Sequence, residues 1–520
     1  MRLFTRCSAV TLVTLATVCG CASTGATSGP RAAPEGSARP APADRQRLSE
    51  FFARGYFPGR SGQVFYVLRE GDALVSRDPY YKLQHGTAWD YDARIPFILH
   101  GAPFIRTGQF DAPAAQQDLV PTLAALLGAQ LPATATGRVL SEALAGGAAR
   151  PRLAVVVVLD GMRADYLDTR ADVMPTLTRL RREGASFANA RVNYLPTMTS
   201  VGHATLGTGA DPRVHGQATN TLYNKVTRRP QDAYFGLDPS ELMALTLADA
   251  WSLQTQGKAI VVGQGGAIRA TAGLVGHGAC LVGGYKMVAA SYATSDGGWE
   301  TNPDCYTKSA ALAPLNARQV WEAAGGTWMG HDIANPSRVR ASSLFQRFEG
   351  EALAAVVEAE AVGADEVTDL VLVNLKATDW VGHAYGPDSK EMTETLAELD
   401  RQLARFLALV ARKAGPGGAV VAITADHGMP SEPPTGRRFY NDTLIAAIHE
   451  RFDPQGKAVV QYLGDLAASQ IHIDRPRLES LGHSLDEVAR FLESQPFIAA
   501  AFTEDEVRAA GQGLHPHGRD

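Results

Sequence analysis

The chain has 520 residues, 45% of them hydrophobic and 20% charged, a composition typical of a globular protein with a large core. This length suits one large α/β domain with insertions, or two to three smaller domains. The formal net charge of −5 gives no electrostatic basis for binding a nucleic acid polymer. A small nucleotide bound through a metal ion stays compatible with that charge.

The first 21 residues have the pattern of a bacterial lipoprotein signal peptide. A basic start, Met1–Arg6, precedes the apolar run Ala9–Val18, which is too short to span a bilayer. The run ends in V-C-G-C, where a small residue before Cys21 resembles a lipobox with Cys21 as the lipidated residue. The alternative is an ordinary secretory signal that is cleaved nearby. We therefore expect an exported protein, either periplasmic or attached to the outer membrane through a lipid anchor alone.

Residues 22–44 lack an apolar period and are rich in Pro, Gly, Ala and Ser, which predicts a flexible tether. A catalytic domain is then expected over residues 45–520. Within it, the segment from Gly284 to about Arg347 is rich in Gly, Ser, Asn, Trp and Tyr and has weak periodicity. We interpret this segment as a cap insertion that covers the site.

Short β-branched runs alternate with helical patterns along the rest of the chain. The predicted strands are Gln63–Leu68, Ile95–His100, Leu153–Leu159, Ala259–Val262, Asp369–Leu375, Ala419–Thr424 and Gln470–Ile473. The predicted helices are Pro175–Glu183, Ala352–Ala361, Lys390–Lys413 and Leu485–Glu493. Continuous apolar runs such as AVVVVL and AVVAIT indicate strands that are buried on both faces of a parallel sheet. The alternation predicts an α/β fold with a doubly wound, mostly parallel sheet flanked by helices.

Three aspartates follow predicted central strands. Asp160, Asp379 and Asp426 each lie at or just past a carboxyl end, the edge where open α/β sheets bind ligands. A single such aspartate could be an N-cap, but His383 lies one helical turn after Asp379 and His427 directly follows Asp426. Nitrogen together with carboxylate ligands suits zinc, and other divalent metals are possible.

The segment at 193–220, NYLPTMTSVGHATLGTGADPRVHGQATN, contains four candidate nucleophiles. A threonine at a helix start can present its oxygen to a metal while the first helical amides face a phosphate. Metal coordination must lower the pKa of that hydroxyl, because threonine alone is a poor nucleophile. Spacing alone does not choose among Thr197, Thr199, Thr205 and Thr208.

The motifs D-G-M-R, P-T-M-T-S-V-G-H-A-T-L-G-T-G, H-G-x-x-x-N, A-T-D-W-V-G-H-A-Y-G-P and T-A-D-H-G together resemble the alkaline phosphatase superfamily. The most similar branch is the type I phosphodiesterase/nucleotide pyrophosphatase group with its phosphate-irrepressible alkaline phosphatase relatives. The resemblance implies an alkaline phosphatase-like fold with two zinc ions, Thr199 as the nucleophile, and Asn220 holding a phosphoryl oxygen. It implies one metal held by Asp160, Thr199, Asp426 and His427, and another held by Asp379, His383 and a histidine late in the chain.

That late histidine is out of place here. The family carries it in a segment like T-H-G-T-x-Y-x-Y-D-x-x-V-P-L near the C-terminus, and none of His449, His472, His483, His515 and His517 lies in such a segment. The run QHGTAWDYDARIP does match it, and it contains His85. In the family, the residues before that segment resemble TEDEVRAAG. Here TEDEVRAAG occupies residues 503–511, near the end of the chain. Joining residue 520 to about residue 45 restores the family order, so we expect a circular permutation in which residues 45–149 form the family's C-terminal part. The alternative is that His85 is a surface residue and another histidine binds the metal.

The substrate expectation depends on a second departure from the family pattern. Monoesterase relatives resemble one another in a Lys-x-Arg before a G-A-I triplet, and here those two positions are Gly263 and Gly265. Loss of both cations disfavours a dianionic monoester, although Arg269, His277 or Lys286 could compensate. We therefore expect a phosphodiesterase that acts on a small phosphoester.

Three alternatives to this function are compatible with the fold. The first is a phosphomonoesterase on the same scaffold, and the second is a non-catalytic metal-binding surface lipoprotein. A sulfatase is disfavoured because the Cys/Ser-x-Pro-x-Arg motif is absent at the nucleophile position. Cys280 and Cys305 could pair in an oxidising compartment or stay as two free thiols. The oligomeric state cannot be read from the sequence.

Overall fold

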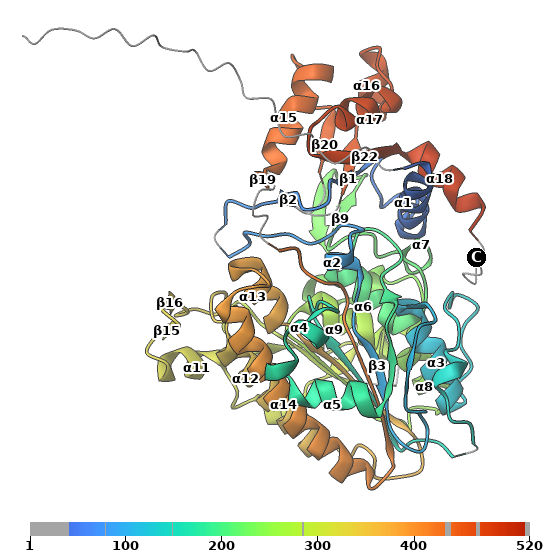
Figure 1. Cartoon of the computed structure of the whole chain (residues 1–520), viewed down its shortest axis with the longest axis vertical. Coiled ribbons are helices and arrows are strands. Elements are labelled where there is room, and N and C mark those ends of the chain that lie inside the picture. The colour runs from blue at the N-terminus through green and yellow to red at the C-terminus, as the bar shows by residue number, and fades with distance from the viewer. Residues whose placement is uncertain are drawn as a thin grey trace, which may run out of the picture. The chain divides into compact units, whose positions relative to one another are not determined.

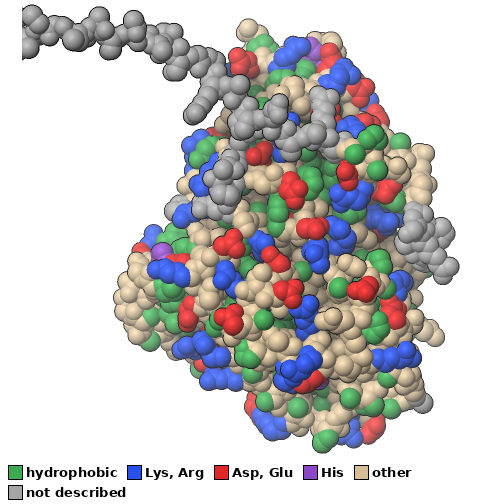
Figure 2. All heavy atoms as spheres, in the orientation of Figure 1, with side chains coloured by type: hydrophobic (Ala, Val, Ile, Leu, Met, Phe, Trp, Pro, Cys, Tyr) green, Lys and Arg blue, Asp and Glu red, His purple; other side chains and the backbone are tan. Residues whose placement is uncertain are grey.

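The computed structural model describes residues 41–514, apart from 79, 148, 283–284, 286, 432–437 and 464–468. The expected signal peptide, the lipidation site Cys21, most of the tether, Lys286, His515 and His517 lie outside the described residues. Among the helices that the structure describes, none has the length and hydropathy of a membrane-spanning segment. Basic and acidic side chains are intermixed on the face shown in Figure 2, in agreement with the small net charge.

A 10-stranded sheet forms the centre of the molecule. Its order is β13-β12-β11-β17-β6-β18-β3-β7-β4, with β14 beside β12 (Figure 1). The strands are β3 (Phe97–His100), β4 (Gly108–Phe110), β6 (Leu153–Leu159), β7 (Ala185–Phe187), β11 (Val261–Gly265), β12 (Met287–Tyr292), β13 (Trp299–Glu300), β14 (Tyr306–Thr307), β17 (Asp369–Leu375) and β18 (Ala419–Thr424). The run from β12 to β18 is parallel, whereas β3 pairs antiparallel with β18. The predicted mostly parallel α/β sheet is confirmed.

Two groups of helices cover the sheet (Figure 1). One group contains α5 (Pro175–Glu183), α12 (Ser343–Ala359), α13 (Ala377–Tyr385) and α14 (Lys390–Ala414). The other contains α3 (Leu119–Leu127), α6 (Thr199–Thr208), α8 (Leu247–Gln254) and α9 (Ile268–Val275). Every residue of β6 and β17 is buried, as expected for central strands covered on both faces. This arrangement brings the carboxyl ends of β6, β17 and β18 to one edge of the sheet.

Two predicted strands belong to a separate sheet. β1 (Val64–Leu68) and β21 (Gln470–Ile473) form an antiparallel sheet with β20 (Val460–Tyr462) and β22 (Ile498–Thr503), in the order β20-β21-β1-β22. It packs on an apolar core of its own with α15 (Asn441–Phe452), α16 (Arg475–Ser480) and α17 (Leu485–Glu493). An apolar run indicates that a strand is buried but not which partners it pairs with, and this is why the sequence placed both strands in one sheet.

The first and last described segments of the chain lie against each other. α1 (Pro42–Gly55) packs beside α18 (Glu504–Gln512), as Figure 1 shows, and β1 pairs with β22. Arg45 Nη2 donates a hydrogen bond to the carbonyl oxygen of Ala501 at 2.9 Å, and Tyr56 Oη donates one to Glu504 Oε1 at 2.5 Å. The helix starts at Pro42, so the last three residues of the predicted tether are helical.

The first part of the predicted cap insertion belongs to the main sheet. Within the range 284–347, β12, β13 and β14 extend the main sheet, and β12 pairs in parallel with β11 from Val262 to Gly265. What remains outside that sheet includes α11 (Ala317–Ala323) and the hairpin of β15 (Thr327–Trp328) and β16 (His331–Asp332). Glycine-rich turns between short strands weakened the periodic signal there. A disulfide joins Cys280 to Cys305, with their Cα atoms 4.7 Å apart.

Candidate metal centre

The three aspartates that follow β6, β17 and β18 converge at one edge of the main sheet. Asp160 directly follows β6, Asp379 lies in the first turn of α13 after β17, and Asp426 follows β18. Each side chain is at most 2% exposed. Buried carboxylates this close together need compensating positive charge, since their mutual repulsion and desolvation are otherwise costly.

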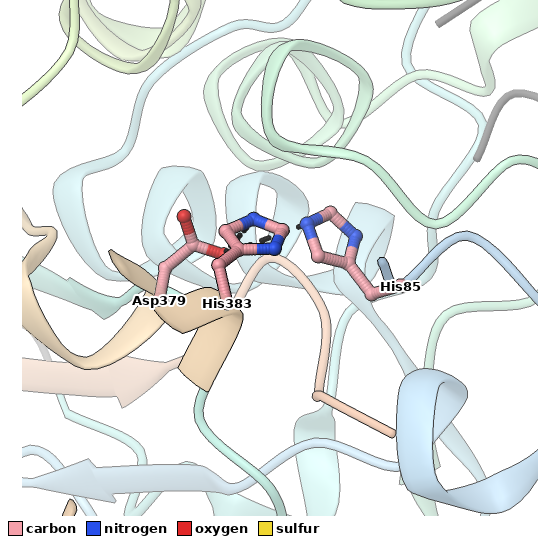
Figure 3. A group of neighbouring side chains, drawn as sticks. All are labelled: His85, Asp379 and His383. Atoms are coloured by element: carbon pink, nitrogen blue, oxygen red, sulfur yellow. Dashed lines mark ion pairs between the residues drawn. The ribbon is translucent and has the colours of Figure 1, made fainter. Parts of the chain in front are cut away.

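His85, Asp379 and His383 form the first candidate group (Figure 3). Asp379 Oδ1 lies 3.4 Å from His85 Nε2 and 3.3 Å from His383 Nε2. The ligand atoms of a tetrahedral zinc site with bonds of about 2.0–2.1 Å lie about 3.3–3.4 Å apart, so the spacing fits. Asp379 Oδ1 is buried and has no hydrogen-bond partner in the described structure, which leaves it available as a ligand.

Both histidines of this group are held in the same tautomer. His85 Nδ1 donates to the carbonyl oxygen of Thr197 at 2.8 Å, and His383 Nδ1 donates to that of Leu83 at 2.5 Å. Each Nε2 therefore presents its lone pair to the carboxylate, the usual arrangement of metal-binding histidines. Burial, helped by His427, lowers the pKa of His85 to about 3, which favours the neutral form that a metal requires.

The second group consists of Asp160, Thr199, Asp426 and His427. His427 Nε2 lies 3.1 Å from Asp426 Oδ2, 3.6 Å from Asp160 Oδ1 and 3.4 Å from Thr199 Oγ1. His427 Nδ1 donates to the carbonyl oxygen of Gly428 at 2.9 Å, so its Nε2 also faces the oxygens. Asp426 Oδ2 is buried without a hydrogen-bond partner among the described residues. These four side chains also fit a tetrahedral ion.

Burial and neighbouring charges set the ionisation of the three aspartates. Burial and the neighbouring Asp426 raise the pKa of Asp160 to about 6. The pKa values of Asp379 and Asp426 are held well below the usual range; burial opposes this shift, but His383 and His427 beside them outweigh it. The site therefore contains at least two firmly ionised carboxylates.

A second layer of residues orients these groups. The amide of Asn374 donates to Asp160 Oδ2 at 2.8 Å and lies 2.9 Å from His203 Nε2. His203 Nδ1 bonds the carbonyl oxygen of Thr199 at 2.9 Å, so both its ring nitrogens are engaged. His203 also lies near Asp160 and Asp426, but this engagement makes it a support and not a ligand.

Lys376 is a residue of this site that the sequence motifs did not indicate. This lysine is fully buried, and its Nζ lies 2.7 Å from Asp160 Oδ1, 2.7 Å from Asp379 Oδ2 and 2.9 Å from Thr199 Oγ1. Burial disfavours its charge, yet Asp160 and Asp379 raise the pKa of Lys376 above its ordinary value. A usable signal was its place directly after a central strand and one helical turn before Asp379.

The site opens into a pocket of about 440 Å³ whose lining includes Thr199, Asn220 and Arg269. Thr199 is the first residue of α6, and Asn220 Oδ1 accepts a hydrogen bond from the amide of Ser200 at 2.9 Å. Among Thr197, Thr199, Thr205 and Thr208, only Thr199 lines this pocket. Arg269 Nε is buried and has no hydrogen-bond partner among the described residues.

The glycines of β11 leave no room for the cations expected at their positions. A Cβ built on Gly263 would lie 2.1 Å from Val275 Cγ1, and one on Gly265 would lie 2.6 Å from Thr271 Oγ1. Of the three proposed substitutes, His277 is held by Asp249 through its Nδ1 at 2.9 Å, and it does not line the pocket. Arg269 does line the pocket.

Fold and site together define a hydrolase of the alkaline phosphatase superfamily that acts on phosphoric esters. Residues 154–500 match the family model described as "Type I phosphodiesterase / nucleotide pyrophosphatase", and the chain belongs to this family. It is 27% identical to the alkaline phosphatase PafA of Elizabethkingia meningoseptica over 433 residues, covering 69% of this chain and 76% of PafA. It is also 27% identical over 341 residues to the alkaline phosphatase PhoV of Synechococcus elongatus, covering 55% of this chain and 60% of PhoV.

A short stretch is similar to a phosphodiesterase. The venom phosphodiesterase of Macrovipera lebetinus is 37% identical over 70 residues, which is 14% of this chain and 8% of that protein. The crystal structure of wild-type PafA superposes with a TM-score of 0.57 at 23% identity, covering 68% of this chain and 77% of that one. This likeness supports the alkaline phosphatase-like fold.

Proposed function

We propose that this chain is a two-zinc phosphodiesterase that works through a covalent phosphothreonine on Thr199. The observation that carries the proposal is the position of Thr199 Oγ1. It lies 3.4 Å from His427 Nε2, at the start of a 10-residue helix, and it lines the pocket. A hydroxyl in this place can reach both a bound phosphoester and a metal.

The two groups would hold one zinc ion each, His85, Asp379 and His383 on one side and Asp160, Thr199, Asp426 and His427 on the other. The unpartnered Asp379 Oδ1 and Asp426 Oδ2 support this assignment. Zinc bound there supplies Lewis-acid charge that makes the threonine hydroxyl more acidic and stabilises the oxygens of the phosphoester. Other divalent metals with the same ligand preferences are possible.

The chain's own residues perform the remaining steps. Thr199 Oγ1 attacks phosphorus as its hydroxyl proton passes to solvent, and the bond from phosphorus to the leaving oxygen breaks, so that this oxygen takes a proton and departs as an alcohol. Water then attacks the phosphothreonine, which still carries the second ester group; the bond from Thr199 Oγ1 to phosphorus breaks, Oγ1 regains a proton, and the product is a phosphomonoester. The side-chain amide nitrogen of Asn220 is placed to donate to a phosphoryl oxygen, because the Oδ1 of Asn220 already accepts a hydrogen bond from Ser200 N.

The preference for a diester depends on positive charge near the substrate. Gly263 and Gly265 supply no positive charge, and neighbouring side chains leave no space for a larger residue at either position. Arg269 is the pocket-lining cation among the described residues, and one guanidinium matches a monoanionic diester better than a dianionic monoester. The relatives named alkaline phosphatases favour a second candidate, a phosphomonoesterase on the same scaffold.

An assay of the zinc-loaded protein tests the proposal. We expect kcat/KM for bis(4-nitrophenyl) phosphate to exceed that for 4-nitrophenyl phosphate by about tenfold or more, a difference of about 1.4 kcal/mol. A higher value for the monoester would select the phosphomonoesterase. No hydrolysis of either ester with both metals bound would support the non-catalytic lipoprotein.

We also infer that the chain is a circular permutant within its family. His85 lies beside Asp379 and His383, the family model matches only from residue 154, and α1 packs on α18. A lipid anchor on Cys21 is proposed from the sequence alone. It would hold the enzyme at the membrane surface, with the catalytic domain free to act on small soluble phosphoesters.

A further inference from the structure

The ammonium of Lys376 joins the two metal-ligand groups. It contacts Asp160 Oδ1 and Thr199 Oγ1 in one group and Asp379 Oδ2 in the other. An ammonium has three N–H donors, and these three acceptors use all of them. The side chain is fully buried, so its ammonium cannot contact solvent and interacts with the site residues instead.

Lys376 leaves one carboxylate oxygen in each group free, Asp379 Oδ1 in the first and Asp426 Oδ2 in the second. It binds Asp379 through Oδ2, whereas Oδ1 faces the two histidines. In the second group it contacts Asp160 and Thr199, and Asp426 Oδ2 keeps no hydrogen-bond partner among the described residues. Asp160 Oδ1 and Thr199 Oγ1 accept from Lys376, but each oxygen keeps a further lone pair for a metal ion, so a metal in each group and the lysine can be present together.

The surrounding structure is shaped around this lysine. The carboxyl group of Glu349 accepts hydrogen bonds from the amides of Lys376 at 3.1 Å and of Ala377 at 3.2 Å. A Cβ on Gly266 would lie 2.5 Å from Lys376 Cβ and 2.3 Å from Glu349 Oε1. Gly266, which directly follows β11, thus makes room for the lysine in the same stretch that lacks the two expected cations.

We propose that Lys376 is a further catalytic residue, whose ammonium hydrogen-bonds the nucleophilic oxygen of Thr199 and adds one fixed positive charge between the two metal-ligand groups. It holds Oγ1 for attack and stabilises the negative charge on that oxygen, both as it attacks phosphorus and as it leaves from the phosphothreonine. No proton has to move to or from the lysine in either step. The role of Thr199 rests on the proposed function, whereas the charge between the two groups does not.

The test compares two variants. Lys376→Met keeps an unbranched side chain that is one atom shorter and removes the charge and the donors, whereas Lys390→Met changes an exposed lysine at the start of α14. With bis(4-nitrophenyl) phosphate and zinc, we expect kcat of Lys376→Met to fall by about 10²-fold or more. KM should stay within about threefold, because the ammonium acts on the transition state more than on bound substrate. Lys376→Gln keeps a hydrogen-bond donor without the charge, so its kcat should lie between that of Lys376→Met and that of the wild type. The Lys390→Met protein should match the wild type.

Zinc affinity, measured by competition with a chelating dye, is the second readout. Removing a cation from between two metal groups should leave the apparent Kd for zinc equal or lower. Weaker zinc binding, a kcat within about fivefold of the wild type, or failure of both variants to fold with zinc present would each overturn the proposal. If the wild-type protein hydrolyses neither ester, the proposed function fails, and the zinc comparison still decides where the charge of Lys376 acts.

Discussion

His85 Nε2 and Asp379 Oδ1 lie 3.4 Å apart, although His85 precedes every strand of the main sheet and Asp379 follows one of its central strands. The Nδ1 of the histidine is fixed by the carbonyl oxygen of Thr197, which lies just before α6. The segment that carries His85 is therefore held against both the strand edge and the helix that begins with Thr199. An early segment of the chain completes a site otherwise built from its middle.

Thr199→Ala should lower turnover by a factor on the order of 10³ or more, because it removes the attacking oxygen. Asp160, Asp426 and His427 remain, so zinc should stay bound. Steady-state kinetics and metal analysis of the purified variant measure both effects. Thr227→Ala, which changes an exposed threonine outside the pocket lining, serves as the control and should keep its rate. A near-normal rate for Thr199→Ala would exclude this residue as the nucleophile.

His85→Ala should reduce the zinc content from two ions to one and lower kcat by about 10²-fold or more. Loss of a residue that only supports a metal ligand costs about 10- to 100-fold in metal affinity or activity, and loss of the ligand itself should cost at least as much. Metal analysis after dialysis against zinc-free buffer gives the stoichiometry. His483→Ala is the control, because His483 lies away from the site beside Glu487. Two zinc ions retained by His85→Ala would mean that another residue completes the first group.

A chain reopened between Gly147 and Pro151, with Asp520 joined to Arg45 by a short linker, should fold and keep zinc. Arg45 lies in the first turn of α1 and Asp520 follows α18, two helices that pack together, and Gly147, Ala149 and Arg150 at the new opening are exposed. We expect its midpoint of thermal unfolding to lie within about 5 °C of the wild type. A matched chain opened inside β6, between Val155 and Val156, should be insoluble. Loss of folding in the first chain would count against the circular permutation.

Glu349 should make stability fall as pH rises. Burial raises its pKa to about 8 from an ordinary value near 4.5, so between these values the folded state binds more protons than the unfolded state. The stabilising contribution of its protonated form is present at pH 5 and is lost as the pH approaches 8. Glu349→Gln cannot ionise, so it should be more stable relative to the wild type at pH 8 than at pH 5. Urea unfolding at both pH values measures this difference, and equal pH dependence of the two proteins would contradict it.

Local patterns located the regular elements well where apolar runs were continuous. The bounds of β6, β17, β18, β21, α5 and α17 coincide with the predicted ones. Burial on both faces leaves a continuous apolar run in a central strand, and an amphipathic helix leaves a 3.6-residue period, so both are visible in sequence. The partners of β1 and β21 were not visible, because pairing in an antiparallel sheet depends on contacts between distant segments.

The sequence by itself determined the chemistry of the site: carboxylates at strand ends, an aspartate and a histidine one helical turn apart, and a threonine at a helix start. These signals are local, since each depends on neighbouring residues within one turn or one strand. Only the tertiary structure decided that His85 faces Asp379 and that Lys376 lies between the two metal-ligand groups. Both facts depend on where distant backbone segments place their side chains, and a lysine after a strand has no spacing that distinguishes a buried ammonium from an exposed one. In the folded protein, Glu349 and Gly266 pack around Lys376 and keep its side chain buried.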